Sequence, residues 1–283
     1  MSRIAYVNGR YVPHRAASVH IEDRGYQFAD GVYEVIAVRG GRLIDELPHF
    51  DRLDRSLREM RIASPMAREP LRHALREVIR RNRVADGIVY LQITRGAAPR
   101  DHAFPKSARP ALVITAKRAL PKFAQMEKGV VVVTVPDIRW KRRDIKTVNL
   151  TANVLAKQQA VEAGAFDAWL VDDEGMISEG TASNAWIVSK AKELITHDPS
   201  HRILNGITRL SVRALAEKEG YRFVERAFSL KEAQGAAEAF ITGTTSWVTP
   251  VIAIDGKKVA GGAPGPLTRA LQKLYAAHAD SPA

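Results

Sequence analysis

The organisation of this chain depends on Arg139-Trp140-Lys141-Arg142-Arg143-Asp144-Ile145-Lys146-Thr147-Val148-Asn149-Leu150, a basic stretch near its middle. Before this stretch, Val130–Val135 is an apolar run closed by a proline, as in a buried strand. After it, apolar residues recur at helical spacing and stop at a glycine, which predicts a helix directly behind the stretch. We therefore expect Lys146 just before a helix start, with Thr147 or Asn149 capping that helix.

The position of Lys146 is unusual for a cation. The N-terminus of a helix carries partial positive charge, and Lys141, Arg142 and Arg143 add like charge nearby. Both effects favour a neutral lysine amine, which is the nucleophile that Schiff-base chemistry requires. The other interpretation is a solvated basic loop, and the stretch by itself leaves both open.

The composition bounds the class of protein. The chain has 283 residues, 46% of them hydrophobic, which is enough for a sizeable core in one or two domains. It has no cysteine, so it contains neither disulfides nor a thiolate metal site. No apolar run approaches the ~20 residues of a membrane span, and the N-terminus lacks the apolar segment of a signal peptide. We expect a soluble cytoplasmic protein that does not associate with a membrane.

The net charge of +12 raises the question of nucleic-acid binding. The arginines are spread along predicted helices rather than gathered in a tail, and no aromatic residues alternate with them in a basic motif. Charge of this kind also suits anionic small molecules or a solvated surface. We expect no nucleic-acid partner.

Strands and helices alternate along the chain with many hairpins, which favours an α+β fold with mixed, largely antiparallel sheets. Residues 117–128 show no strong strand or helix pattern and contain a proline. We predict a smaller N-terminal α/β domain over residues 1–118, a linker over 119–128 and a larger C-terminal domain over 129–283.

Three features could complete a cofactor site around Lys146. Gly206-Ile207-Thr208 opens a predicted helix, where free N–H groups can bind phosphate, although any helix needs such a start. Gly243-Thr244-Thr245-Ser246 follows a strand and suits either a phosphate or a plain polar turn. Glu179 could hold a pyridine nitrogen protonated, or it could be a glutamate at a hairpin edge.

Other kinds of site have no signature in the sequence. The eight histidines are scattered, without a helical His-x-x-x-His pair and its glutamate, so no metal site is predicted. No Gly-x-Ser-x-Gly motif indicates a serine nucleophile. No glycine-rich nucleotide loop of the Gly-x-x-x-x-Gly-Lys-Ser/Thr or Gly-x-Gly-x-x-Gly type is present.

Ordered motifs are spread over nearly the whole chain. They are Glu22-Asp-Arg-Gly-Tyr-Gln-Phe-Ala-Asp-Gly-Val-Tyr-Glu-Val35, Gln92-Ile-Thr-Arg-Gly96, Pro99-Arg100-Asp-His102, Asp137-Ile-Arg-Trp140, Asp144-Ile-Lys-Thr-Val-Asn-Leu150, Glu179-Gly-Thr-Ala-Ser-Asn184, Gly206-Ile-Thr-Arg209 and Thr244-Thr-Ser-Trp-Val-Thr-Pro-Val-Ile252. Taken together, these motifs resemble the class IV, fold-type IV, pyridoxal-phosphate-dependent aminotransferases, closest to the D-amino-acid branch. The resemblance implies two α/β domains with the cofactor between them.

The resemblance also implies roles for single residues. Lys146 would form the Schiff base with pyridoxal 5′-phosphate and move the substrate proton, and Glu179 would pair with the pyridine nitrogen. The residues implied for the cofactor phosphate are Arg52, Ile207, Thr208, Gly243 and Thr244. The residues implied for the substrate are Tyr33 beside the Schiff base, Arg100 and His102 as a carboxylate trap, and Arg139 near that trap.

The implied activity is transfer of an amino group from a D-amino acid, such as D-alanine or D-glutamate, to 2-oxoglutarate or pyruvate. The trap loop would reach into the active site of a partner subunit, so a homodimer is implied. Two alternatives stay within the class, an L-branched-chain aminotransferase and an aminodeoxychorismate lyase. A distant one is a non-catalytic basic protein that binds anions or nucleic acid. Ala29, Gly243 and Trp247 depart from the family's commoner residues.

Overall fold

The structure is a computed structural model that describes residues 3–281. The chain divides into two units. The first holds the residues up to Leu120 together with Ile145–Asn149, and the second holds Pro121–Asp144 and the residues from Leu150 onward. The segment that carries Lys146 is therefore grouped with the N-terminal part of the chain rather than with the sequence on either side of it.

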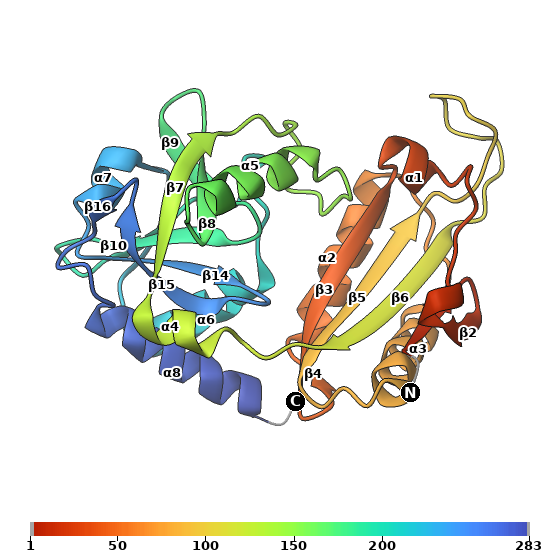
Figure 1. Cartoon of the computed structure of the whole chain (residues 1–283), viewed down its shortest axis with the longest axis horizontal. Coiled ribbons are helices and arrows are strands. Elements are labelled where there is room, and N and C mark those ends of the chain that lie inside the picture. The colour runs from red at the N-terminus through yellow and green to blue at the C-terminus, as the bar shows by residue number, and fades with distance from the viewer. Residues whose placement is uncertain (1–2, 282–283) are drawn as a thin grey trace. The chain divides into compact units, whose positions relative to one another are not determined.

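The first unit is built on a six-stranded sheet with the strand order β2-β1-β6-β5-β3-β4, in which all neighbours are antiparallel. Figure 1 shows β3, β5 and β6 side by side with α2 behind them. Its elements are β1 (Ile4–Val7), β2 (Arg10–Pro13), a 3-10 helix (His14–Ala16), α1 (Arg24–Phe28), β3 (Gly31–Arg39), β4 (Arg42–Leu43), α2 (Glu46–Glu59), α3 (Arg68–Arg81), β5 (Gly87–Thr94) and β6 (Ala111–Arg118).

Local sequence explains the main features of this unit. The first hairpin turns at Asn8-Gly9, where both residues have positive φ, the backbone that a two-residue hairpin turn requires. Helices α2 and α3 bury their apolar stripes in one core with the strands. That core contains Phe50, Leu53, Leu57, Leu71, Leu75, Val78, Val89, Leu91 and Ile93.

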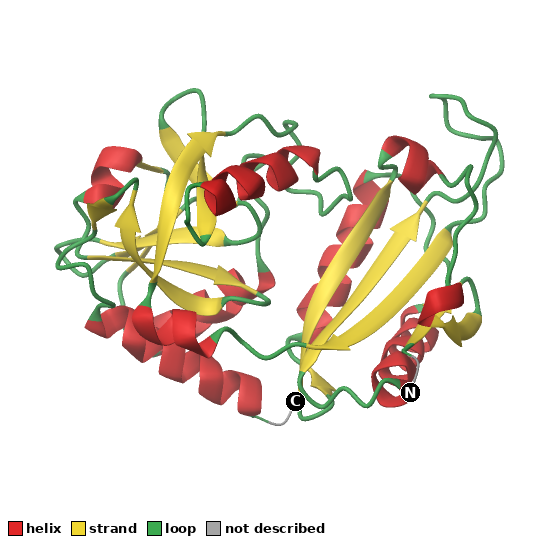
Figure 2. Cartoon of the chain, viewed as in Figure 1, coloured by secondary structure: helices red, strands yellow, loops and turns green. Residues whose placement is uncertain are grey.

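The second unit is built on a ten-stranded mixed sheet with the order β12-β11-β10-β14-β15-β7-β8-β9-β13, and β16 pairs with β15. Three pairings are parallel: β11 with β12, β15 with β7, and β7 with β8. Figure 2 shows helices packed around these strands. The strands are β7 (Val130–Pro136), β8 (Asp167–Val171), β9 (Met176–Gly180), β10 (Asn184–Val188), β11 (Leu194–Thr196), β12 (Phe223–Glu225), β13 (Phe228–Ser229), β14 (Glu238–Gly243), β15 (Trp247–Ile254) and β16 (Lys257–Lys258). The helices are α4 (Phe123–Lys128), α5 (Thr151–Glu162), α6 (Ile207–Lys218), α7 (Leu230–Gln234) and α8 (Pro266–Asp280).

The prediction of mixed, largely antiparallel sheets is confirmed, and three short elements occur where the sequence shows no clear pattern. Residues 123–128 form α4, which packs on β15, so the predicted linker contains a helix. The polar stretch before β3 contains the short helix α1. Residues 176–180 form β9, a strand that was not predicted. These elements are short, and short elements give periodicity little signal.

The predicted cap behind Lys146 is wrong. Helix α5 begins at Thr151, its N-cap is Leu150, and no side chain caps it. Residues 145–149 instead extend along β3, where Thr147 forms a β-bridge with Val32. Because the field of a helix end falls off within about one turn, the helix-terminus argument does not account for Lys146.

No helix among residues 3–281 is both long and apolar enough to cross a membrane. Within the same residues, no cluster of three or more histidine or acidic side chains has the arrangement of a metal site.

Candidate functional site

Lys146 lies against Tyr33 in the first unit. The Tyr33 N–H donates to the Lys146 carbonyl at 3.0 Å, which fastens the lysine segment to β3. The Lys146 ammonium nitrogen Nζ lies 4.3 Å from the centroid of the Tyr33 ring, within the range of a cation–π contact. The lysine is half-buried. Two predicted site residues are thus brought together by pairing between distant segments.

A buried carboxylate, Glu34, organises the side chains beside this pair. Nε of Arg52 donates to Oε1 of Glu34, and Nη2 donates to Oε2, both at 2.8 Å. Nδ1 of His49 lies 2.7 Å from Oε2 of the same carboxylate. Arg52, predicted to bind phosphate, is therefore held in a fixed orientation by a carboxylate on the neighbouring strand.

Electrostatics link this cluster to Lys146. Burial alone would raise the pKa of the Glu34 carboxyl, but Arg52 and His49 lower it to about 2. Burial lowers the pKa of His49 even though Glu34 opposes the shift, and the charges of Arg52 and Lys146 act in the same direction as burial. The cluster therefore holds an ionised glutamate and a histidine that favours its neutral form.

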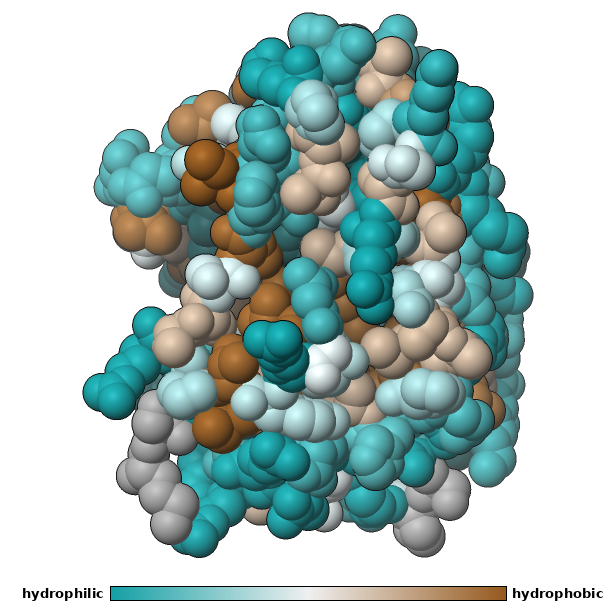
Figure 3. Space-filling model, turned by 90° about the vertical axis from the view of Figure 1, so that its right-hand side faces the viewer, coloured by the Kyte–Doolittle hydropathy of each residue, from teal (hydrophilic) through white to brown (hydrophobic). Residues whose placement is uncertain are grey.

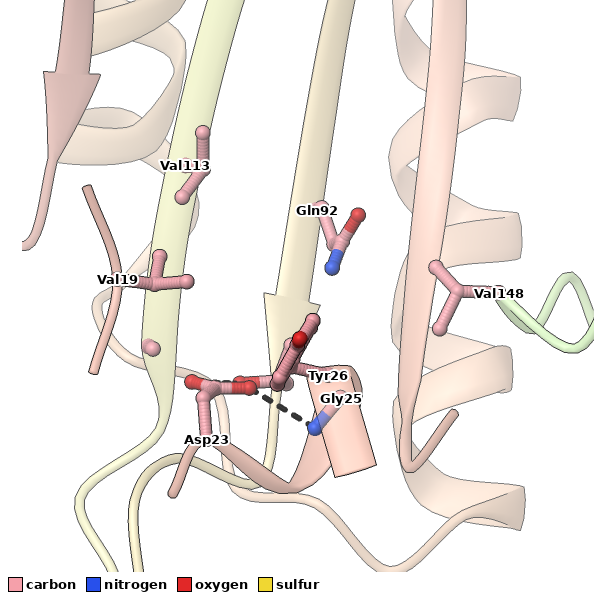
Figure 4. A pocket seen from close by; sticks show the side chains of 9 residues that line it. Val19, Asp23, Gly25, Tyr26, Gln92, Val113 and Val148 are labelled. Atoms are coloured by element: carbon pink, nitrogen blue, oxygen red, sulfur yellow. Dashed lines mark hydrogen bonds between the residues drawn. The ribbon is translucent and has the colours of Figure 1, made fainter. Parts of the chain in front are cut away.

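A hollow of about 300 Å³ opens on the same face of this sheet as the Tyr33 ring. Gln92 lines it and lies directly opposite Tyr33 in the β3–β5 register. Val148, two residues after Lys146, also lines it (Figure 4). The Tyr90 hydroxyl donates to Gln92 at 2.6 Å, and burial raises the pKa of Tyr90 to about 12, which keeps this hydroxyl protonated. The lysine segment therefore borders a cavity that is lined by both polar and apolar residues.

The predicted carboxylate trap lies on the connection between β5 and β6. Arg100 and His102 are both exposed, and both contact the ring of Phe28, at 4.8 Å and 5.4 Å from its centroid. The two trap residues thus share one aromatic support.

On the side of the molecule shown in Figure 3, apolar side chains gather in a band flanked by hydrophilic ones.

Glu179 is the centre of a second group, in the second unit. It is fully buried on β9, and its carboxylate accepts hydrogen bonds from the Leu204 N–H and from Nδ2 of Asn184, each at 3.1 Å. Burial raises the pKa of the Glu179 carboxyl, against the opposing effect of the Arg139 guanidinium. A positively charged group brought beside this carboxyl would favour its ionised form.

Arg139 belongs to the glutamate group. Its Nη1 donates to Oε1 of Glu179, and its Nε and Nη2 hold Asp137 at 2.9 and 2.7 Å. Ser178 bridges the same set, since its hydroxyl donates to Asp137 at 2.7 Å. The guanidinium is almost wholly buried by these partners.

The start of α6 has the form of an anion cradle. Its N-cap is Gly206, and no side chain caps the helix, so the first N–H groups have no partner within the helix. Thr208 is buried there. A Cβ on Gly206 would lie 2.1 Å from Oδ1 of Asn184, so only glycine fits. Asn184 therefore touches both Glu179 and the start of this helix.

Gly243 and Thr244 lie where β14 turns into β15. A Cβ on Gly243 would lie 2.9 Å from Oγ of Ser246 and 3.1 Å from the Ala182 carbonyl, so the turn leaves little room for a side chain. Trp247 is buried with φ of 50°, an uncommon backbone for a large residue. Its ring packs edge-on against Tyr275 of α8.

The basic neighbours of Lys146 in sequence are paired with carboxylates. Arg142 binds Asp144 through two hydrogen bonds, and Arg143 lies 3.4 Å from Asp137. Lys141 is exposed. The positive charge expected from this run is therefore largely offset within the second unit.

Sequence reasoning missed Glu34, His49 and Asn184 as site residues. A signal existed for Glu34, because Val32, Glu34 and Ile36 alternate along β3 and all three face the core. A carboxylate on the buried face of a strand requires partners. No comparable signal marks His49, which lies on the apolar side of α2.

Comparison with known proteins relates the chain to one family. The family model described as amino-transferase class IV matches residues 31–254. A D-alanine aminotransferase of Bacillus licheniformis is 43% identical over 94% of this chain and 93% of its own length. The D-alanine aminotransferase of Staphylococcus haemolyticus is 38% identical over 98% of each chain.

The solved structures that superpose on the chain are also aminotransferases. A branched-chain amino acid aminotransferase of Escherichia coli superposes with a TM-score of 0.89 at 25% identity, covering 96% of this chain and 93% of that one. The branched-chain enzyme of T.th., solved with pyridoxamine 5′-phosphate, gives 0.88 at 27% identity, covering 98% and 93%.

Proposed function

The chain belongs to the class IV aminotransferases, and on this premise we propose that it transfers amino groups from D-amino acids to 2-oxo acids with pyridoxal 5′-phosphate as cofactor. The observation that carries the proposal is identity of 38–43% over nearly the whole chain to relatives named D-alanine aminotransferases. The sequence identity of the superposed branched-chain enzymes to this chain is 25–27%. D-Alanine and D-glutamate are the expected donors, and pyruvate and 2-oxoglutarate are the expected acceptors.

The described residues fit the cofactor's three functional groups. Lys146 offers an amine for the aldehyde, next to the Tyr33 ring. Glu179 offers a buried carboxylate for a protonated ring nitrogen. The uncapped start of α6 with Thr208, the turn at Gly243 and Thr244, and Arg52 offer donors for a phosphate.

Each residue then has a distinct task. When bound, pyridoxal 5′-phosphate supplies an electron sink for the electron pair left at the substrate Cα. Nζ of Lys146 would act as the general base that takes the proton from the substrate Cα. Tyr33 keeps Nζ beside its ring. Glu34 and His49 hold Arg52 in orientation for the phosphate.

Arg100 and His102 are proposed to bind the substrate carboxylate by charge-assisted hydrogen bonds. Fixing the carboxylate decides which Cα substituent faces Lys146, and therefore which enantiomer reacts. We propose a further task for Arg139, whose partners are Glu179 and Asp137. It fixes the carboxylate that meets the ring nitrogen.

A homodimer is also proposed. Helix α5 buries Ala156 and Ala160 in its own unit, yet leaves Val154, Leu155 and Val161 exposed by 64, 52 and 56%. An apolar surface of this kind commonly meets another protein surface, and a second copy of this chain is the proposed occupant. The cytoplasmic location remains a prediction.

The cofactor assignment is tested by borohydride reduction followed by peptide mapping. We expect the protein to carry a pyridoxyl group on Lys146. Lys146→Ala should remain folded, carry no label and lose transamination, because the missing group is a reactant. Lys141→Ala, which removes an exposed lysine of the same basic stretch, serves as the matched control and should keep its label and activity. A label on another lysine would overturn the assignment.

The substrate assignment is tested separately with Arg100→Ala. The loss of one charge-assisted contact should raise KM for D-glutamate and 2-oxoglutarate by an amount equivalent to roughly 1.5–3 kcal/mol. An unchanged KM would remove Arg100 from the proposed trap while leaving the cofactor assignment intact.

A further inference from the structure

The connection between β5 and β6 carries Arg100 and His102 over residues 95–110 without a helix or a strand of its own (Figure 2). A connection of this length normally has more than one conformation unless other residues hold it. Both trap side chains are exposed. Something other than burial must therefore fix their position.

Arg24 contacts the main chain of this loop at three consecutive residues. Its Nη1 donates to the carbonyl oxygens of Asp101 at 2.6 Å and Ala103 at 3.3 Å. Its Nη2 donates to the His102 carbonyl at 3.4 Å. Because these acceptors are backbone atoms, the contacts fix the path of the loop and leave the His102 ring and the Arg100 guanidinium available.

Arg24 is itself fixed by a buried ion pair. It is buried, and its Nε donates to Asp30 at 2.8 Å. Asp30 also accepts two hydrogen bonds from Arg95, at 2.7 and 2.9 Å. Arg95 in turn donates to the Met60 and Arg61 carbonyls at the end of α2, each at 2.8 Å. The loop is thus connected through buried charges to the end of a long helix.

Two aromatic rings contact charged side chains of the loop. The Phe28 ring, at the end of α1, is contacted by Arg24 and Arg100, each at 4.8 Å, and by His102. The Phe104 ring lies under Arg95 at 3.7 Å. Arg24 and Phe28 belong to one short helix, so α1 acts as a single support beneath both trap residues.

We propose that Arg24, together with the Phe28 ring, positions Arg100 and His102 for the substrate carboxylate. The inference rests on the proposed function, because it presupposes that these two residues bind that carboxylate. Arg24 does not touch substrate. It sets the loop conformation in which the trap exists before substrate arrives, which lowers the ordering cost of binding.

The first test compares Arg24→Gln with the wild-type holoenzyme. KM for pyruvate and 2-oxoglutarate should rise about tenfold, the effect of weakening one charge-assisted contact, with kcat changed much less. Hydrogen exchange of the backbone amides of residues 100–104 should become faster. The control, Arg72→Gln, removes an arginine that is paired with Glu46 and Glu69 on the helix surface and has no loop contact. Its KM should not change.

The decisive test combines Arg24→Gln with Arg100→Ala. If Arg24 acts through the trap, its effect on KM in the Arg100→Ala background should shrink to the part carried by His102, so the KM of the double variant should lie well below the product of the two single effects. If Arg24 only stabilised the fold, the effects of the two substitutions on KM would multiply, and that result would overturn the proposal. If Arg24→Gln does not fold, Phe28→Leu serves as the test variant, because it leaves the buried charges in place. Its KM for the 2-oxo acids and the hydrogen exchange of its loop amides then test the positioning role.

A failure of the proposed trap can be distinguished from a failure of the positioning role of Arg24. If Arg100→Ala itself leaves KM unchanged, the proposed trap is wrong. If Arg100→Ala raises KM while folded Arg24→Gln and Phe28→Leu do not, the trap stands and the positioning role is wrong.

Discussion

At the residue scale, each of the two groups of candidate site residues contains a buried carboxylate that is held by a neighbour of opposite charge. Lys146 lies beside Tyr33 and affects His49, which shares the Glu34 carboxylate with Arg52. Glu179 is held by Arg139, itself bound to Asp137. In each group a charged side chain is removed from water only because its partners satisfy it. Removing one partner should therefore have effects on both stability and function.

Glu34 should give the protein a measurable sensitivity to acid. Its pKa lies near 2 in the folded protein, against 4.5 for the free side chain, so its stabilisation is complete above about pH 4.5 and is lost as the pH falls toward 2. From about pH 6 to about pH 3, the free energy of unfolding of the wild type should fall by about 2 kcal/mol more than that of Glu34→Gln. Urea unfolding at both pH values measures this, and equal losses would contradict it.

Arg139 can be separated from the role that its sequence position suggested. If it holds Glu179, Arg139→Gln should weaken cofactor binding by roughly tenfold or more, because a buried carboxylate loses its cation. KM for the 2-oxo acid should change little. Titration of the apoprotein with pyridoxal 5′-phosphate gives the first quantity and steady-state kinetics the second. Arg139→Lys, which keeps a positive charge, is the control. A raised KM with normal cofactor affinity would return Arg139 to the substrate trap.

At the scale of single elements, the short segments carry the site. Helix α1, strand β9 and the extended segment 145–149 hold Arg24, Glu179 and Lys146. The long helices α2 and α3 each carry two turns or more of apolar periodicity, the pattern that identifies a helix from sequence. A five-residue element has no such period, and its conformation depends on partners elsewhere in the chain.

The departure at Ala29 has a structural meaning at this scale. Ala29 is the C-cap of α1 with φ of 56°, a left-handed backbone that glycine adopts without the steric cost of a Cβ. Ala29→Gly should therefore raise the free energy of unfolding by about 1 kcal/mol. Ala163, the C-cap of α5 with φ of −80°, is the matched control, and Ala163→Gly should be neutral or destabilising. Denaturant midpoints that move in the same direction for both would contradict this explanation.

At the scale of the whole molecule, the fold-type IV prediction is confirmed by the mixed sheets and by the branched-chain aminotransferases that superpose on the chain. The motifs supplied the site residues that are proposed above. They did not reveal that residues 145–149 are grouped with the first unit, because that depends on a pairing with β3 that is remote in sequence. The same limit applies to the Arg139–Glu179 contact, whose partners lie forty positions apart.

The proposed dimer leads to a prediction for α5. Leu155→Glu would place a charge in an apolar interface between two copies, which is costly when unpaired, so the variant should sediment as a monomer. Leu47→Glu changes a leucine of similar exposure, 59%, on α2, and should sediment like the wild type. Analytical ultracentrifugation distinguishes the two. A Leu155→Glu variant that remains dimeric would exclude this helix from the interface.

The central claim is that the chain acts on D-amino acids. The measurement that tests it most directly is an assay of the purified holoenzyme with both enantiomers of alanine, glutamate and leucine, with 2-oxoglutarate or pyruvate as acceptor. We predict turnover of D-alanine and D-glutamate and little or none of their L-enantiomers. Activity confined to L-leucine would contradict the claim and identify an L-branched-chain aminotransferase on the same fold.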